Sequence, residues 1–214
     1  MKKRALWRGG IYAAGTLLLA LGHSLGTTAG IGVSPILSVP YTVAGHTPLT
    51  VGTASILNYF LFVLLQIAMT RGRGWAKMLL QIPFSILFGL LLDFFIGILP
   101  TAPPTFIGRY GTYLCSMLSV AAGITMMVNM RLINNPADGF AEVLGTHFGH
   151  DTGFGKNLID ITYACISLLT QFVTGVNVGA IGAGSILSAI FVGRFVSLFS
   201  RLFRAKMLRL AGLE

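Results

Sequence analysis

Six apolar runs of roughly 20 residues each constrain this chain more than any other feature of its sequence. A hydrocarbon core about 30 Å thick is crossed by roughly 20 helical residues, because each residue rises by about 1.5 Å. The predicted spans are Ile11 to Ala29, Leu49 to Thr70, Met78 to Leu99, Thr112 to Met130, Leu158 to Val176 and Ala180 to Leu202. Because 54% of the residues are hydrophobic and only 10% are charged, the chain suits lipid better than water. We therefore predict an all-α polytopic membrane protein, one transmembrane domain over residues 1–214.

The basic residues indicate which ends of the spans face the cytoplasm. Lys and Arg near span ends stay on the cytoplasmic side, and Arg109 alone falls on the opposite side. The basic residues that all fall on one side are Lys2, Lys3, Arg4, Arg8, Arg71, Arg73, Lys77, Arg131, Lys156, Arg201, Arg204, Lys206 and Arg209. Arg194 lies inside the sixth predicted span, from which its side chain could reach the cytoplasmic edge. This pattern predicts a bacterial cytoplasmic membrane protein with both termini inside. The alternative is a signal peptide cleaved near Ala29.

Several function classes are disfavoured by the residues themselves. The net charge of +9 comes in short bursts between spans, so we expect the lipid bilayer and no nucleic acid as partner. His147, His150 and Asp151 are surrounded by glycines, which disfavours a metal site. Cys115 and Cys165 lie in apolar runs and are interpreted as small core residues. Because no catalytic or phosphate-binding motif occurs, we predict neither an enzyme nor a cofactor.

An internal repeat relates the two halves of the sequence. Matches at an offset of 100 to 101 positions follow one another in order, among them Pro35 with Pro136, and define a repeat A at about 11–99 and a repeat B at about 112–202. A rival match, IGVSPILS with IGAGSILS, does not extend further. Because three spans precede the second copy, that copy must lie upside down relative to the first. The sequence thus predicts two inverted three-helix repeats, an arrangement typical of secondary transporters.

Each repeat contains a short segment between its first and second spans that begins like a helix. Ser34 and Asn135 suit a capping position, and Pro35 and Pro136 suit the first helical position after it. Residues proposed to end these helices are Gly45, Gly145 and Gly149. About ten residues span half a bilayer. We predict that each segment is a re-entrant half-helix, although the second is polar enough to lie partly at the cytoplasmic surface.

Polar residues inside the spans are the candidates for solute binding. Asp93 is the strongest, because a carboxylate deep in a span is costly unless it has a function or a structural partner. Asp160 has a structural alternative, as an acid near a helix start. Further polar residues read as interhelical hydrogen-bond partners are Gln66, Gln81, Gln171, His23 and Asn129. The predicted solute-binding residues are Asp93, Asn58, Ser34, Pro35, Asn135, Pro136, Asp138, Asp160, Ser185 and Arg194.

Three stretches carry a resemblance to a known family. GIGVSPILSVPYTV, NPADGFAEVL and GAIGAGSILSAIFVGRFVSLF resemble the YczE/YyaS/YitT family of bacterial membrane proteins over nearly the whole chain. The sequence stops a dozen residues after the sixth span and lacks the soluble C-terminal domain of the YitT branch, so it is similar to the YczE branch. The resemblance implies a bacterial multi-span membrane protein that is expected to transport a solute, and it implies no specific site residue.

Three functions are compatible with these features. The inverted repeat, the two half-helices and Asp93 favour a secondary transporter or permease for a small polar or anionic solute. A ligand-binding membrane subunit of an energised transporter is the first alternative, although the first span lacks the spaced alanines typical of such subunits. A non-transporting assembly or lipid-binding factor is the second. The sequence leaves the oligomeric state open, a homo-oligomer included.

Overall fold

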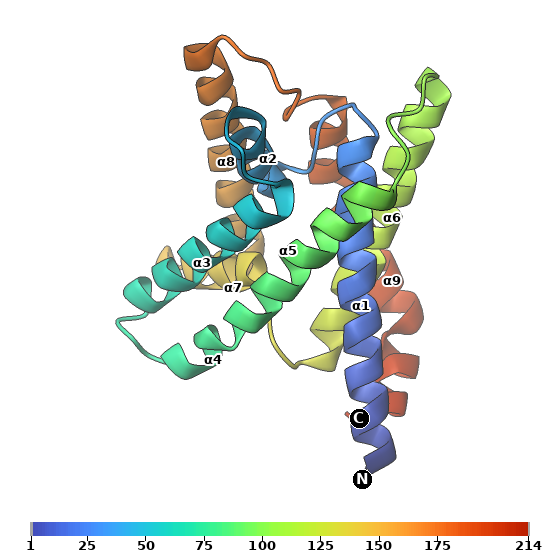
Figure 1. Cartoon of the computed structure of the whole chain (residues 1–214). Coiled ribbons are helices and arrows are strands. Elements are labelled where there is room, and N and C mark those ends of the chain that lie inside the picture. The colour runs from blue at the N-terminus through green and yellow to red at the C-terminus, as the bar shows by residue number, and fades with distance from the viewer. Residues whose placement is uncertain (1, 214) are drawn as a thin grey trace.

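The computed structural model describes residues 2–213, with side chains from residue 4 onward, as a set of helices without strands (Figure 1). The helices are α1 (Lys2–Thr28), α2 (Pro35–His46), α3 (Val51–Met69), α4 (Trp75–Leu79), α5 (Gln81–Ile98), α6 (Phe106–Met130), α7 (Pro136–His147), α8 (Thr152–Thr174) and α9 (Ala183–Ala211). The predicted all-α class is confirmed. The side chains of Lys2 and Lys3, used above to orient the chain, lie outside the described part.

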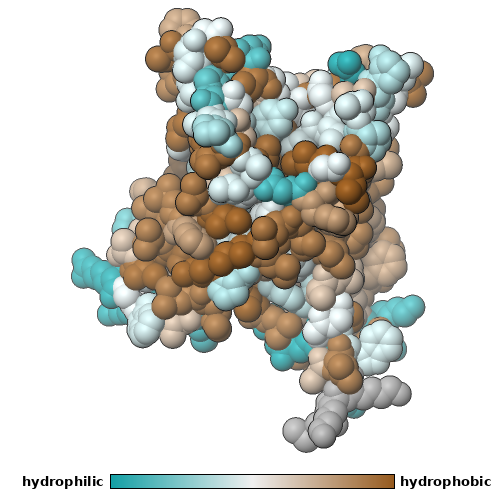
Figure 2. Space-filling view, in the orientation of Figure 1, coloured by the Kyte–Doolittle hydropathy of each residue, from teal (hydrophilic) through white to brown (hydrophobic). Residues whose placement is uncertain are grey.

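Five helical segments are long and apolar enough to cross a membrane. They are Arg4–Thr28, Val51–Met69, Trp75–Ile98, Phe106–Met130 and Ala183–Ala211. The sixth predicted span falls in α8, a continuous helix of 23 residues. Its apolar sequence is broken up by polar residues, among them Asn157, Asp160 and Gln171. Figure 2 shows a broad apolar band across the middle of the molecule, with hydrophilic residues mostly toward its two ends. Together these features indicate a membrane protein.

Capping residues, rather than the edges of the apolar runs, decide where the helices begin. The Thr105 hydroxyl accepts a hydrogen bond of 3.1 Å from the Gly108 N–H, and α6 therefore starts several residues before the predicted Thr112. The Asp151 carboxylate accepts one of 2.9 Å from the Phe154 N–H at the start of α8. Hydropathy marks only the part of a helix that suits lipid, so α1 and α6 begin before their predicted spans, whereas α3 and α5 lie within theirs.

Two interpretations of single residues are wrong. Gly45 does not end α2, which continues past it; a Cβ at Gly45 would lie 2.4 Å from Cγ1 of Val178, so its role is close packing. Cys115 and Cys165 are exposed rather than in the core, because an apolar residue in a membrane protein faces lipid as readily as protein. By contrast, Gly149 follows α7 with a φ of 73°, as predicted for a helix-ending glycine.

The helix order repeats along the chain. The short helices α2 and α7 each have 12 residues, begin with proline, and start 101 positions apart, at residues 35 and 136. Each lies between two long helices, and each packs against the second long helix of the other half, α2 on α8 and α7 on α3. Both chain ends lie at the same end of the molecule (Figure 1), called the terminal end below. Ser34 and Asn135 occupy the predicted capping positions.

The packing of α1 against α6 also repeats. A Cβ added at Gly22 would lie 2.7 Å from the backbone nitrogen of Val120, and a Cβ added at Gly123 would lie 2.7 Å from the backbone nitrogen of Leu19. Gly123 and Val120 stand 101 positions after Gly22 and Leu19. The two helices therefore cross at contacts that are equivalent in the two halves, and glycine lets their backbones approach closely.

The two halves differ in how their last two long helices pack. In the first half, α3 packs along α5, where a Cβ at Gly52 would lie 2.1 Å from the Gly89 carbonyl oxygen. In the second half, α8 packs mainly on α2 and α7, and Figure 1 shows it standing apart from α9. A connection through residues 175–182, which begins and ends at glycine, joins these separated helices. The molecule is thus asymmetric despite its repeated elements.

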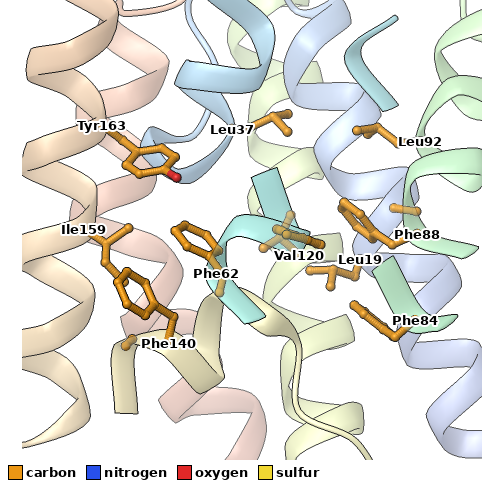
Figure 3. Packing of buried hydrophobic residues seen from close by; sticks show 14 of the residues in the cluster. Leu19, Leu37, Phe62, Phe84, Phe88, Leu92, Val120, Phe140, Ile159 and Tyr163 are labelled. Carbon is orange, nitrogen blue, oxygen red and sulfur yellow. The ribbon is translucent and has the colours of Figure 1, made fainter. Parts of the chain in front are cut away.

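A cluster of buried aromatic side chains forms the centre of the molecule (Figure 3). Phe62 of α3 stacks on Phe140 of α7 with ring centroids 4.9 Å apart, and Tyr59 stacks on Phe88 of α5 at 5.4 Å. The His23 ring of α1 meets Phe88 edge-on at 5.9 Å. These contacts hold α1, α3, α5 and α7 together by packing, which drives helix association within lipid.

Candidate functional site

The N-terminus of each half-helix points into the interior of the molecule. Ser34 precedes α2 without capping it; its hydroxyl lies instead 3.3 Å from Nδ1 of His23. Asn135 caps α7, where its Oδ1 accepts a hydrogen bond of 3.1 Å from the Ala137 N–H. Proline at the first position of each helix has no N–H to satisfy. The α2 start thus lacks a side-chain cap, and its positive dipole end can act on an anion.

Side chains from α3 and α8 meet these helix starts near the middle of α3. Tyr59 of α3 is buried, and its hydroxyl interacts with the Asn135 side chain at the start of α7. The Tyr163 hydroxyl donates a hydrogen bond to Oδ1 of Asn58. The Nδ2 group of Asn58 is buried and has no partner in the described structure. A buried amide donor without a partner is costly, so this group offers a donor to a bound molecule.

Three charged side chains lie around this region, all from the second half. Lys156 of α8 is close enough to His23, Asp138 and Asp160 for its charge to act on each of them. Asp138 and Asp160 also act on one another. All three charged side chains are partly buried. Because charge inside a membrane protein is expensive, such a group of both signs is typical of a solute or ion pathway.

We call the residues that meet here the central polar cluster. Its members are His23, Ser34, Asn58, Tyr59, Asn135, Asp138, Lys156, Asp160 and Tyr163. They come from α1, α3, α7 and α8 and from the residues that precede α2 and α7. The charged members, Asp138, Lys156 and Asp160, all belong to the second half of the chain. The members from the first half are polar side chains and one histidine.

A pocket of about 330 Å³ reaches the cluster from beside α6 and α7. Asn135 and Asp138 line its inner part, and Asn134, Glu142 and Thr152 line the part nearer the connections between helices. Those connections, between α6 and α7 and between α7 and α8, belong to the terminal end. The cluster is therefore accessible to a small molecule from that end.

A second group of polar contacts links α3, α5 and α7 through the side chains of Gln66 and Gln81. Nε2 of Gln66 donates to Oε1 of Gln81 at 3.0 Å, and Nε2 of Gln81 donates back to Oε1 of Gln66 at 3.1 Å. Nε2 of Gln66 also donates to the Pro136 carbonyl at 3.2 Å. The predicted role of Gln66 and Gln81 as interhelical hydrogen-bond partners is confirmed.

Asp93 lies away from the central polar cluster and has structural partners. Its carboxylate accepts hydrogen bonds from the Thr50 hydroxyl at 2.6 Å and from the Gly52 N–H at 2.7 Å. A carboxylate at a helix N-terminus is favoured by the dipole and by the free N–H groups there. Asp93 of α5 therefore caps α3, the structural alternative considered from the sequence.

Of the remaining predicted residues, Ser185 lies near the start of α2, and Arg194 lies in neither the central polar cluster nor the Asp93 contact. Ser185 is buried at the start of α9, and its hydroxyl donates to the Val33 carbonyl at 2.6 Å, just before α2. Arg194 is exposed, with its guanidinium carbon 5.5 Å from the centre of the Phe191 ring. The structure does not bring Arg194 to Asp93. Asp160 lies two turns inside α8, so it is not the helix-start acid considered above; Asp151 has that role.

Sequence reasoning missed Lys156, Tyr59 and Tyr163 and assigned His23 only a bonding role. Lys156 was counted as a residue flanking the fifth span, because its helix was predicted to begin at Leu158. One signal could have found it. Lys156, Asp160 and Tyr163 are spaced by four and three residues, which places them on one helix face.

The comparisons with known proteins identify one family. The model of a family of unknown function, DUF6198, matches residues 6–201. No curated protein and no solved structure matches the chain.

Proposed function

We propose that this chain, which belongs to the DUF6198 family, is a secondary transporter for a small polar or anionic solute and not an enzyme. In this proposal α8 is a sixth span beside the five long apolar helices. The terminal end faces the cytoplasm of a bacterium, because most basic connections lie there. The likeness to the YczE/YyaS/YitT family remains a prediction from the sequence.

The proposal treats the two halves as inverted repeats related by an axis in the membrane plane. The equal lengths and 101-residue spacing of α2 and α7 support this relation. So does the α1–α6 crossing, because a two-fold axis between these helices exchanges the Gly22–Val120 contact with the Leu19–Gly123 contact. Such an axis places the starts of α2 and α7 on opposite sides of one central site.

The asymmetry between the halves supports alternating access. In the present arrangement α3 packs against α5, whereas α8 stands apart from α9. If the halves exchange these arrangements, α8 closes on α9 and α3 leaves α5. That exchange closes the pocket at the terminal end and opens the opposite end. Two states of similar packing are what a carrier requires.

One observation carries the proposal: Asp138 lies in the first turn of α7 and lines a pocket with Asn135, within range of the charges of Lys156 and Asp160. Lys156 and the uncapped start of α2 suit a carboxylate or another anionic group. The two carboxylates suit a cationic group or a proton on the same solute. A small molecule with an anionic group and a polar or cationic one therefore fits best.

The test is solute-evoked current in proteoliposomes on a solid-supported membrane, screened against amino acids, carboxylates and other small anions. We expect at least one solute to evoke a current in the wild type. Lys156→Gln should abolish it, and Lys206→Gln, a matched change at an exposed lysine of α9 outside the cluster, should not. Binding detected by thermal shift without any current would favour a ligand-binding subunit instead. Equal currents in Lys156→Gln and the wild type would contradict the assigned site.

A further inference from the structure

A large basin opens at the terminal end, beside the pocket that reaches the central polar cluster, and it shares Asn134 and Glu142 with that pocket. It has a volume of about 1060 Å³ and lies between the turn that joins α3 to α4 and the connection from α6 to α7. Four basic side chains line it: Arg71, Arg73, Lys77 and Arg131. Glu142 is its one lining carboxylate, and Asn134 Nδ2 lies 3.4 Å from it. The basin is therefore strongly cationic.

The backbone at two of these arginines is strained. Arg71 and Arg131 have φ values of 51° and 49°, and they are the two non-glycine residues in the described part of the chain with positive φ. Each follows the end of a long helix, a position where glycine avoids the steric cost of the left-handed conformation. Both strained residues are arginines and both line the basin. Strain of this kind is common at ligand sites, where the side chain is needed despite its cost.

The left-handed conformation of Arg71 belongs to the cap that ends α3, where the Gly72 N–H donates to the Ile67 carbonyl at 2.9 Å. Glycine is the usual residue in such a cap, so neither the cap nor membrane orientation explains the choice of arginine. The last carbonyls of α6 already accept hydrogen bonds from Arg8, at 2.8 Å each for Met130 and Arg131. The tendency of basic residues to stay in the cytoplasm explains their side of the membrane. It does not explain why they converge on one concavity or why two of them adopt a conformation that suits glycine.

Two buried glutamines form part of the basin lining. They are Gln66 and Gln81, which are tied by their reciprocal hydrogen bonds. A Cβ at Gly139, also in the lining, would lie 2.7 Å from Oε1 of Gln66, so α7 packs tightly on this pair. A ligand in the basin therefore meets the amide groups of the two glutamines as well as the basic side chains.

We propose that this basin binds a phosphate group, carried either by an anionic lipid headgroup or by a soluble phosphate compound. Guanidinium groups match phosphate oxygens in pairs, and a lysine adds a mobile positive charge. The basin is open to the end where headgroups and cytoplasmic solutes both lie in the proposed topology. The inference stands on the basin's own residues and holds whatever solute the central cluster takes.

The test measures unfolding temperatures of the full chain in a neutral detergent, at constant ionic strength. The probes are pyrophosphate and dioctanoyl phosphatidylglycerol, with dioctanoyl phosphatidylcholine as the neutral lipid. Arg71→Gln/Arg73→Gln/Arg131→Gln is compared with Arg4→Gln/Arg201→Gln/Lys206→Gln, which removes as many charges outside the basin. We expect a stabilising shift by at least one anionic probe in the wild type and the control. The basin variant should need at least about tenfold more probe for the same shift.

A second variant keeps the test decisive if the first folds poorly. Arg71→Gly/Arg131→Gly removes two charges and relieves the left-handed strain, so its unfolding temperature without probe should rise while its response to the probe is lost. Pyrophosphate alone as the active probe indicates a soluble ligand, and phosphatidylglycerol alone indicates a lipid. No shift with either anionic probe overturns the proposal. So does a shift that is equal in the basin variants and the control.

Discussion

The backbone N–H of Gly52 donates a hydrogen bond of 2.7 Å to the carboxylate of Asp93, which joins the first turn of α3 to α5. The Thr50 hydroxyl donates a second bond of 2.6 Å to the same carboxylate. In the second half, α8 is instead capped by Asp151, the residue directly before it, and not by a side chain of α9. Asp93 therefore holds together the helix pair that the proposed exchange must separate.

Asp93→Asn should destabilise the protein, because a neutral amide replaces a charged acceptor of two hydrogen bonds. We expect a loss of about 1–3 kcal/mol in the free energy of unfolding, measured by denaturant titration in mixed micelles. Asp151→Asn is the control, since asparagine caps helices about as well as aspartate does. Unchanged stability of Asp93→Asn, together with loss of solute current, would restore the direct transport role predicted from the sequence.

The α1–α6 crossing predicts equal sensitivity at two glycines in different halves. Gly22→Ala and Gly123→Ala should each destabilise the protein by about 1–3 kcal/mol, because the added methyl group overlaps the facing backbone. Gly9→Ala is the matched control in α1, where a Cβ would meet nothing within 4 Å. The same unfolding titration measures all three. A large effect at only one of the two crossing glycines would argue against equivalent contacts.

The proposed topology predicts on which side single cysteines react. In a background without Cys115 and Cys165, Ala76→Cys in α4 should react with an impermeant maleimide only in inside-out vesicles. Thr101→Cys, between α5 and α6, should react only in right-side-out vesicles. Both positions are exposed in the structure. If both cysteines react from the same side, the chain does not cross the membrane an odd number of times between residues 76 and 101, and the proposed topology is wrong.

The sequence allowed the helices and their order to be predicted well. Five spans follow from apolar runs, and both short helices begin at the predicted residues because Ser34, Asn135 and the prolines after them are strong local signals. Local signals do not depend on which helices become neighbours. That is why the starts of the two short helices were predicted correctly, although the end of α2 at Gly45 was not.

The site was harder to predict because it depends on neighbours far apart in the chain. Asp93 looked isolated in its span, and only the fold shows that its carboxylate meets the Thr50 hydroxyl and the Gly52 N–H. Lys156 looked like a residue at a span end, and only the fold brings it near His23 from α1. Periodicity along α8 could reveal one face, but no pattern in the sequence pairs that face with α1.

The central claim is that the half-helix starts meet at a site reached in turn from both faces of the membrane. Ser34→Cys, a small change at the start of α2, tests it in the background without Cys115 and Cys165. A positively charged, impermeant thiosulfonate reagent is applied to inside-out and to right-side-out vesicles, with Ala76→Cys as the one-sided control. The account predicts that Ser34→Cys reacts from both sides. Reaction from one side only, or from neither, would contradict it.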